Sequence, residues 1–336
     1  MDTKITTKNI SLRYVKTVGV YNNSSSGRGF AHPVDLTVSK NGRIFVLNRG
    51  RYCRIGVCNL EEEYLYEFGS LGDDDGQFRL ASAIALDSQE HLYVADEAHN
   101  RITLFDSSGT FLGKWGGHGS GDGQLAGPSG LAFDSEDNVY VVDQNNNRVQ
   151  KFTSEGGYLA QWGGPGDGDG QFNLPWGIAL DFEGNVYVAD WRNDRIQKFA
   201  PDGRFVAKFG ESGDGDGQFH RPSSVAVDSE GYIYVADWGN ERVQILAPDG
   251  SFLLGLRGQA TLSVWAEEFL EANIDEKAPR EKANLVSQLP PHLDTPYLTS
   301  AQTEPYFWGP VVNLDGEGRL YVTETSRHRV QVYQRE

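Results

Sequence analysis

A unit of about 47 residues recurs along the chain, and this repeat constrains the fold more than any other feature of the sequence. The units begin at Phe30, Phe78, Leu125, Phe172 and Phe219, so the successive steps are 48, 47, 47 and 47 residues. A sixth unit follows after a step that is lengthened by about 40 inserted residues. Self-similarity at a fixed period of this length indicates a repeat architecture in which each unit packs against its neighbours.

Each unit contains four short runs rich in β-forming residues. In the fourth unit the runs are GIALD, NVYVAD, RIQKF and FVAKFG, and turn residues such as those of 201–203 separate them. The alternating Val, Ile, Tyr and Phe fit strands that are packed on both faces. Radial repetition of four-stranded units leaves only short sheet edges. The sequence therefore predicts an all-β fold, a six-bladed β-propeller of four-stranded blades that forms one domain over residues 1–336.

The two ends of the chain indicate how the ring closes. The sixth unit stops after its third strand at Tyr333, whereas residues 12–19, LRYVKTVG, resemble a fourth strand. We expect this N-terminal strand to complete the last blade. Such closure would tie down both ends and remove an open sheet edge.

The units resemble the NHL repeat, a propeller module with an apolar-Pro start, a YVAD strand and an N-x-RI step. The fourth unit carries these signatures in LPWGIALD, VYVAD and NDRI, and the resemblance covers about 300 residues. It implies a six-bladed propeller that is an RNA- or protein-binding platform in some members and the scaffold of a lyase or related enzyme in others. The resemblance does not choose among these roles, because function belongs to sites grafted on a fold.

A carboxylate near the end of the second strand precedes an arginine by five residues in most units. The pairs are Asp96 and Arg101, Asp143 and Arg148, Asp190 and Arg195, Asp237 and Arg242, and, in the sixth unit, Glu324 and Arg329. The first unit departs from the pattern, with Asn48 and Arg54. A catalytic residue is not needed once per blade, so we interpret the carboxylate as a cap of the turn that pairs with the arginine.

Two features raise the question of a metal. The loops GDDDGQ, GSGDGQ and GDGDGQ interleave carboxylates with glycine, but the full oxygen set of an EF-hand is missing, so turn formation is favoured over calcium or another divalent metal. Some lyases that resemble this scaffold hold a metal through histidines of different blades. Here only His32 directly precedes a blade-starting proline. We expect no metal site and no cofactor.

Residues that depart from the repeat are the better candidates for function. Trp115 and Trp162 fit the fourth-strand template, whereas five other tryptophans do not. Loops between second and third strands and loops between blades open on one face, so we place these five tryptophans, Trp265 of the inserted segment included, at one mouth. The predicted ligand-binding set is Trp176, Trp191, Arg192, His220, Arg221, Trp238, Trp308, His32, Asp35 and Arg49. Such a cluster suits a small-molecule or peptide pocket; alternatively, the tryptophans only anchor the inserted segment.

The inserted segment, residues 259–305, has helical character. Leu262, Trp265, Ala266 and Phe269 follow the spacing of one helix face, and a second helix is expected to begin at Pro279. Because the insertion lies between blades five and six, we expect it to fold over the mouth as a lid or a partner-binding arm.

Charge and composition narrow the function classes. Thirty basic against 47 acidic side chains give a net charge of -17, which argues against nucleic-acid and membrane partners. We find no long apolar run, no secretory start and no common catalytic motif, so the expected compartment is the cytoplasm. The leading hypothesis is a non-catalytic module that binds a peptide, a protein or a small molecule. The alternative is a lyase or hydrolase at the same mouth, whose polar groups Asp35, His32, His220 and Arg221 would have to converge on one empty volume.

Overall fold

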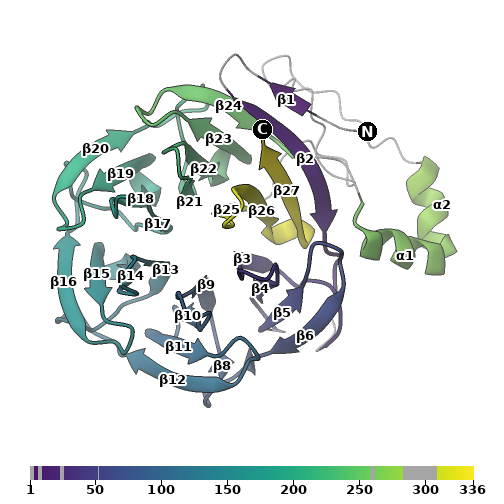
Figure 1. Cartoon of the computed structure of the whole chain (residues 1–336), viewed down its shortest axis with the longest axis horizontal. Coiled ribbons are helices and arrows are strands. Elements are labelled where there is room, and N and C mark those ends of the chain that lie inside the picture. Colours follow the sequence, from purple (N-terminus) through teal and green to yellow (C-terminus); the bar gives the residue numbers. More distant parts are fainter. Residues whose placement is uncertain (1–3, 7–9, 23–25, 52, 259–261, 283–308) are drawn as a thin grey trace.

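The computed structural model describes residues 4–6, 10–22, 26–51, 53–258, 262–282 and 309–336. Six sheets are arranged in a ring, and within each sheet the strands follow one another from the centre of the ring outward (Figure 1). The predicted all-β, six-bladed propeller is therefore confirmed.

The blades follow the order of the chain. Blade one comprises β3 (Pro33–Val38), β4 (Ile44–Asn48), β5 (Arg54–Cys58) and β6 (Tyr64–Phe68). Blade two comprises β9 (Ala81–Leu86), β10 (Leu92–Asp96), β11 (Arg101–Phe105) and β12 (Phe111–Gly116). Blade three comprises β13 (Pro128–Phe133), β14 (Val139–Asp143), β15 (Arg148–Phe152) and β16 (Tyr158–Gly163).

Blades four and five repeat this pattern. Blade four comprises β17 (Ile178–Leu180), β18 (Val186–Asp190), β19 (Arg195–Phe199) and β20 (Phe205–Phe209). Blade five comprises β21 (Pro222–Val227), β22 (Ile233–Asp237), β23 (Arg242–Leu246) and β24 (Phe252–Leu256). Short parallel strands β7 (Ser70–Leu71) and β8 (Gln77–Phe78) join blades one and two. Single 3-10 turns, η1 (Gln144–Asn146), η2 (Trp191–Asn193) and η3 (Trp238–Asn240), connect the second and third strands of blades three to five.

Blade six is built from both ends of the chain. It contains β25 (Pro310–Leu314), β26 (Arg319–Glu324) and β27 (Arg329–Arg335), with turn η5 (Thr325–Arg327) between the last two. The N-terminal β2 (Ser11–Val18) pairs antiparallel with β27, with Tyr14 opposite Tyr333. This confirms the predicted closure of the ring. The structure adds an outer fifth strand, β1 (Lys4–Thr6), which pairs with β2.

The core lies between neighbouring blades. Every residue of the second strands β4, β10, β14, β18 and β22 is buried, which explains why these strands are almost continuously apolar. The residues that begin the units, such as Phe30, Phe78 and Phe172, are almost fully buried in the clusters between blades. The two cysteines, Cys53 and Cys58, are buried and unpaired.

The described part of the insertion forms two helices, α1 (Val264–Ala272) and α2 (Ile274–Lys282). Ser263 caps α1 by accepting a hydrogen bond from the Ala266 N–H. The second helix begins at Ile274 rather than at the predicted Pro279, and acidic residues in its first turn complement the helix dipole.

The two helices do not cover the mouth. They lie outside the ring, beside the junction of blades six and one (Figure 1). Trp265 is only 2% exposed, packs on Phe30, and donates its indole N–H to the Glu62 carbonyl. The expected place of Trp265 at the mouth, and of these helices as a lid, is therefore wrong, because the indole is buried in the outer wall. Residues 283–305 of the expected insertion lie outside the described residues.

None of the helices in the described ranges is long and apolar enough to cross a membrane.

Candidate functional site

The repeated carboxylates of blades three to five have the structural role that their spacing predicts. The Nε of Arg148, Arg195 and Arg242 lies 2.7, 2.8 and 2.7 Å from the carboxylate of Asp143, Asp190 and Asp237. Each carboxylate is fully buried and also accepts the backbone N–H of the residue that follows the start of its unit. A charge-assisted network of this kind fixes the connection between blades.

The Gly-Asp loops complete the same network. Arg148 donates to the carbonyls of Ser120, Gly121 and Gln124, so a guanidinium fills the inside of the loop. The Gln124 side chain folds back and accepts the Gly121 N–H. These contacts agree with turn formation. In the described part of the chain, no three His, Cys, Asp or Glu side chains gather closely enough to hold a metal ion.

Two blades modify the network. In blade one, Asn48 accepts the Ala31 N–H at 2.8 Å, and Arg54 pairs with Glu67 instead. In blade two, the predicted pairing of Asp96 with Arg101 is wrong.

The reason lies in a neighbouring histidine of blade two. His99 Nδ1 lies 2.6 Å from the Asp96 carboxylate, which also accepts the N–H groups of Arg79 and Leu80. Arg101 donates to the Gln77 carbonyl at 2.9 Å.

A cavity of about 350 Å³ opens at the predicted mouth. Four residues of the predicted set line it: His32 and Arg49 of blade one, Trp176 of blade four and Trp238 of blade five. Ser82, Ser223, Thr325 and Ser326 also line it. Arg49 is held by an ion pair with Glu97 at 2.8 Å. We call this space the mouth cavity.

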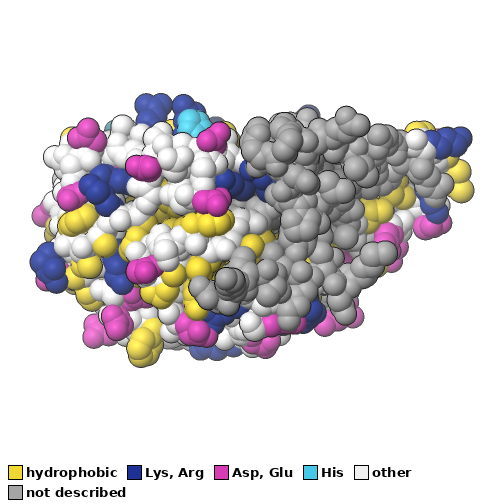
Figure 2. Space-filling model, turned by 90° about the horizontal axis from the view of Figure 1, so that it is seen from above, with side chains coloured by type: hydrophobic (Ala, Val, Ile, Leu, Met, Phe, Trp, Pro, Cys, Tyr) yellow, Lys and Arg dark blue, Asp and Glu magenta, His cyan; other side chains and the backbone are white. Residues whose placement is uncertain are grey.

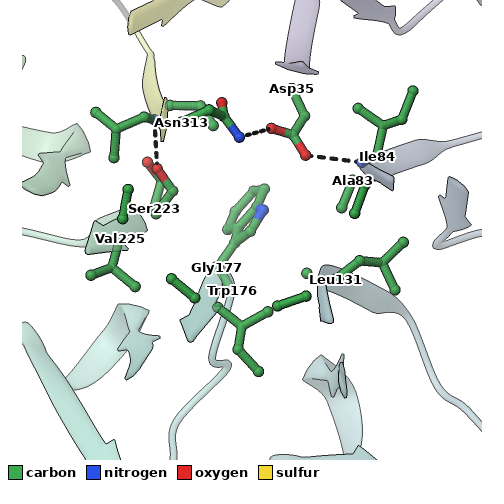
Figure 3. A pocket seen from close by; sticks show the side chains of 18 of the residues that line it. Asp35, Ala83, Ile84, Leu131, Trp176, Gly177, Ser223, Val225 and Asn313 are labelled. Carbon is green, nitrogen blue, oxygen red and sulfur yellow. Dashed lines mark hydrogen bonds between the residues drawn. The ribbon is translucent and has the colours of Figure 1, made fainter. Parts of the chain in front are cut away.

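Trp176 forms the floor of the mouth cavity. Its indole projects into the middle of the ring of blades (Figure 3), and it also lines a second cavity of about 240 Å³ further down the channel. The same repeat position is serine in blades two, three and five, where the hydroxyl donates to a carbonyl of the next blade, as Ser82 does to Pro128 at 2.6 Å. Blade four therefore has a large aromatic ring where three blades have a small hydroxyl.

Asp35 lies in the second cavity, which we call the channel cavity, and does not line the mouth cavity. Its carboxylate accepts the N–H groups of Leu36 and Ile84 and the Asn313 amide, and so joins blades one, two and six (Figure 3). Burial raises the pKa of Asp35 to about 7. The Asn313 Oδ1 is buried and accepts no hydrogen bond from the described residues.

The remaining predicted residues lie beside the mouth cavity. Trp191 packs edge-on against Trp176, with ring centres 5.7 Å apart. The guanidinium carbons of Arg192 and Arg221 lie 5.6 and 5.0 Å from the centre of the Trp191 ring. His220 is exposed and its ring covers Gly239, where a Cβ atom would come within 2.1 Å of the imidazole. Trp308 lies outside the described residues.

The sequence reasoning missed His328. Its Nδ1 accepts the backbone N–H of His32 at 3.0 Å, and its ring lies between His32 and Tyr21. Burial, with a smaller contribution from His32, lowers the pKa of His328 to about 4.

The repeat itself contains the signal that identifies His328. At the equivalent position Asn100, Asn147 and Asp194 accept the N–H of the residue before the next blade. His328 is thus the member of this series that joins blade six to blade one.

These observations define a six-bladed β-propeller with an aromatic cavity at one mouth. The sequence model of the NHL repeat matches residues 125–152, 172–199 and 219–246, so the chain contains NHL repeats, as predicted. No curated protein sequence matches the chain.

Several solved structures share the fold at low sequence identity. Virginiamycin B lyase from Staphylococcus aureus is 14% identical, with a TM-score of 0.57 and coverage of 97% of this chain and 99% of that chain. A streptogramin B lyase is 12% identical, with a TM-score of 0.56 and coverage of 96% and 98%. A protein of unknown function from Bacteroides thetaiotaomicron is 17% identical, with a TM-score of 0.61 and coverage of 93% and 71%. At these identities the likeness shows the fold alone.

Proposed function

We propose that the chain is a binding module that holds a small molecule or a short peptide segment in the mouth cavity. The observation that carries this proposal is the Trp176 indole, which floors a cavity of about 350 Å³ at a position where three other blades have serine. A volume of this order suits a small ligand, and such pockets are commonly aromatic with a few polar groups.

The cavity wall offers both apolar contact and hydrogen bonds. Trp238 is 42% exposed, so its ring is available to a ligand that enters the mouth. Aromatic side chains supply large contact areas, and the hydroxyls of Ser82, Ser223 and Thr325, which already donate to backbone carbonyls, can still accept a hydrogen bond from a ligand.

Binding is favoured over catalysis because the candidate polar groups do not converge. Asp35 lies in the channel cavity, whereas His32 lines the mouth cavity. His220 and Arg221 line neither of these two cavities. A lyase or hydrolase would need a general acid or base within hydrogen-bond reach of one substrate position. Two of the similar structures are lyases, but this likeness supports the fold and not the reaction.

A ligand screen by thermal melting tests the proposal. A ligand present at about 100 times its Kd stabilises the fold by roughly 2.7 kcal/mol, which is readily detected. The informative variant is Trp176→Ser, which introduces the residue of blades two, three and five and so removes the floor with little expected effect on the fold. Trp162→Phe is the matched control, because Trp162 packs in the outer part of blade three against Tyr140 and Phe199.

We expect a hit to stabilise the parent protein and Trp162→Phe but not Trp176→Ser. Binding should persist in EDTA, because the proposal uses no metal ion or cofactor. Equal stabilisation of all three proteins would place the binding site elsewhere and contradict the proposal.

A further inference from the structure

We propose that the ligand of the mouth cavity carries an anionic group, a carboxylate or a phosphate, which Arg192 and Arg221 bind beside the cavity. This inference rests on the proposed function and specifies the chemistry of the ligand. It depends on the arrangement of the two arginines around Trp191, which we call the arginine pair.

The arginine pair is adjacent to the floor of the mouth cavity. Both guanidinium groups lie within 5.6 Å of the centre of the Trp191 ring, and that ring packs on Trp176. Arg221 lies two residues before Ser223, which lines the cavity. An elongated ligand could therefore contact Trp176 with an apolar part while its charged end reaches the arginine pair.

Within the described residues, the charge of the arginine pair is not neutralised. Among the described residues, no carboxylate lies within ion-pair distance of either guanidinium, although both side chains are exposed on a protein of net charge -17. The nearby carboxylate of Asp194 accepts the Arg221 backbone N–H and the Ser212 hydroxyl, each at 2.7 Å. Basic, histidine and acidic side chains are all visible along the upper edge of the molecule in Figure 2.

The arginine pair is also specific to blades four and five. The position of Arg192 is occupied by Ala98, Asn145 and Gly239 in blades two, three and five. The position of Arg221 is occupied by neutral residues in the blades two, three and four. The repeated network of Arg148, Arg195 and Arg242 is separate and buried, so the repeat does not require these two charges.

The chemistry of arginine favours an anion. A guanidinium that rests on an indole keeps its N–H groups available in its own plane, where they match the oxygens of a carboxylate or a phosphate. The aromatic ring also restrains the arginine side chain, which lowers the entropy lost on binding.

Matched pairs of aromatic probes test this inference by calorimetry. Phenylacetate is compared with neutral phenylacetamide, and benzyl phosphate with benzyl alcohol, so that the two arms separate a carboxylate from a phosphate. We expect at least one anionic probe to bind about tenfold or more tightly than its neutral partner. The double variant Arg192→Gln, Arg221→Gln should lose this preference and keep its affinity for the neutral probe.

Arg204→Gln is the control variant. Arg204 is exposed in the same blade but lies in the turn between β19 and β20, at the opposite end of β19 from Arg192. Its loss should leave the preference for the anionic probe unchanged.

The outcomes separate this inference from the proposed function. If charged and neutral probes bind equally and Trp238→Ala weakens both, the cavity binds ligands and the arginine pair is not an anion site. If the arginine variants weaken binding of the anionic probe but Trp238→Ala and Trp176→Ser do not, the arginine pair binds anions without the cavity, and the proposed function fails. Tight binding of a uridine decamer with no binding of either anionic probe would indicate nucleic acid and contradict the inference.

Discussion

The junctions between blades three, four and five differ from the junction that closes the ring. At the regular junctions an asparagine or aspartate side chain, Asn147 or Asp194, accepts the N–H of the residue before the next blade. At the closing junction, where blade six meets blade one, the acceptor is His328. The same hydrogen bond is thus accepted by an amide or carboxylate oxygen at the regular junctions and by an imidazole nitrogen at the closing junction, where burial lowers the pKa of His328 to about 4.

The two sides also differ in how the blades are joined at the rim. Blades three to five repeat one Asp-Arg network with nearly identical distances. Blade six keeps a buried carboxylate–arginine pair, Glu324 with Arg329, and its closing junction adds the N-terminal strand β2 and the packing of Trp265 on Phe30. The comparison teaches that the repeat can change its side chains at a junction without losing the fold, provided that the same backbone groups find partners.

The largest expected effect comes from the closing strand. Deletion of residues 4–18 removes β1 and β2, exposes β27 as an open edge and leaves blade six incomplete. We expect loss of a cooperative thermal transition, measured by circular dichroism. Deletion of residues 4–6 alone, which removes only the outer strand β1, should retain it. Cooperative melting of the longer deletion at an unchanged temperature would show that β2 is dispensable.

The next largest effect concerns the Asp-Arg network of blades three to five. Asp190→Ala leaves the Arg195 guanidinium buried without its carboxylate, and removal of one partner of a buried pair costs about 3–5 kcal/mol. Denaturant unfolding measures this loss. Asp169→Ala, in the exposed pair with Lys208, is the control and should change the free energy of unfolding by less than about 1 kcal/mol. Similar losses in both variants would argue against a special role for the buried network.

A smaller effect is the pH dependence of stability at the closing junction, which the regular junctions should not share. The pKa of His328 is lowered to about 4, so the folded protein binds fewer protons than the unfolded chain between about pH 4 and 6.5. The contribution of this histidine to the free energy of unfolding is fully present above about pH 6.5 and is lost as the pH falls from 6.5 toward 4. His328→Asn introduces the asparagine found at a regular junction. On acidification from pH 6.5 to 4, this variant should be spared a loss of about 1–3 kcal/mol in the free energy of unfolding that the parent protein shows.

The matched comparison is needed because Asp35 acts with the opposite sign. Its raised pKa, about 7, gives stability that is present below pH 3.8 and is lost as the pH rises through 7. Unfolding of the parent protein and of His328→Asn is therefore measured at each pH from 4 to 8, and the difference isolates the histidine. A difference that stays constant across this range would show that His328 does not titrate at the junction.

The fold could be predicted from the sequence because the repeat presents the same evidence many times. The period, the four strands, the closing strand and the Asp190 to Arg195 pairing all follow from positions that recur in register. The failure at Asp96 has a local cause, since His99 takes the carboxylate that the arginine binds in blades three to five.

The candidate site could be predicted only in part. Trp176 and Trp238 were found because they depart from the repeat, and they do line the mouth cavity. Asp35 could not be placed, because Val34 lines both cavities whereas Asp35, the next residue, lines only the channel cavity, and the repeat carries no signal for that depth. The position of α1 depends on contacts of Trp265 with Phe30 and Glu62, which are far apart in the sequence and have no periodic signal.

The central claim is that the mouth cavity is the binding site, and fluorine NMR tests it most directly. The protein is labelled with 5-fluorotryptophan, its resonances are assigned with single tryptophan variants, and the strongest ligand from the screen is titrated. The account predicts that the resonances of Trp176 and Trp238 shift with saturation, while those of Trp115 and Trp162 in the outer strands stay unchanged. Saturable shifts confined to Trp115, Trp162 or Trp265, with Trp176 and Trp238 unaffected, would contradict it.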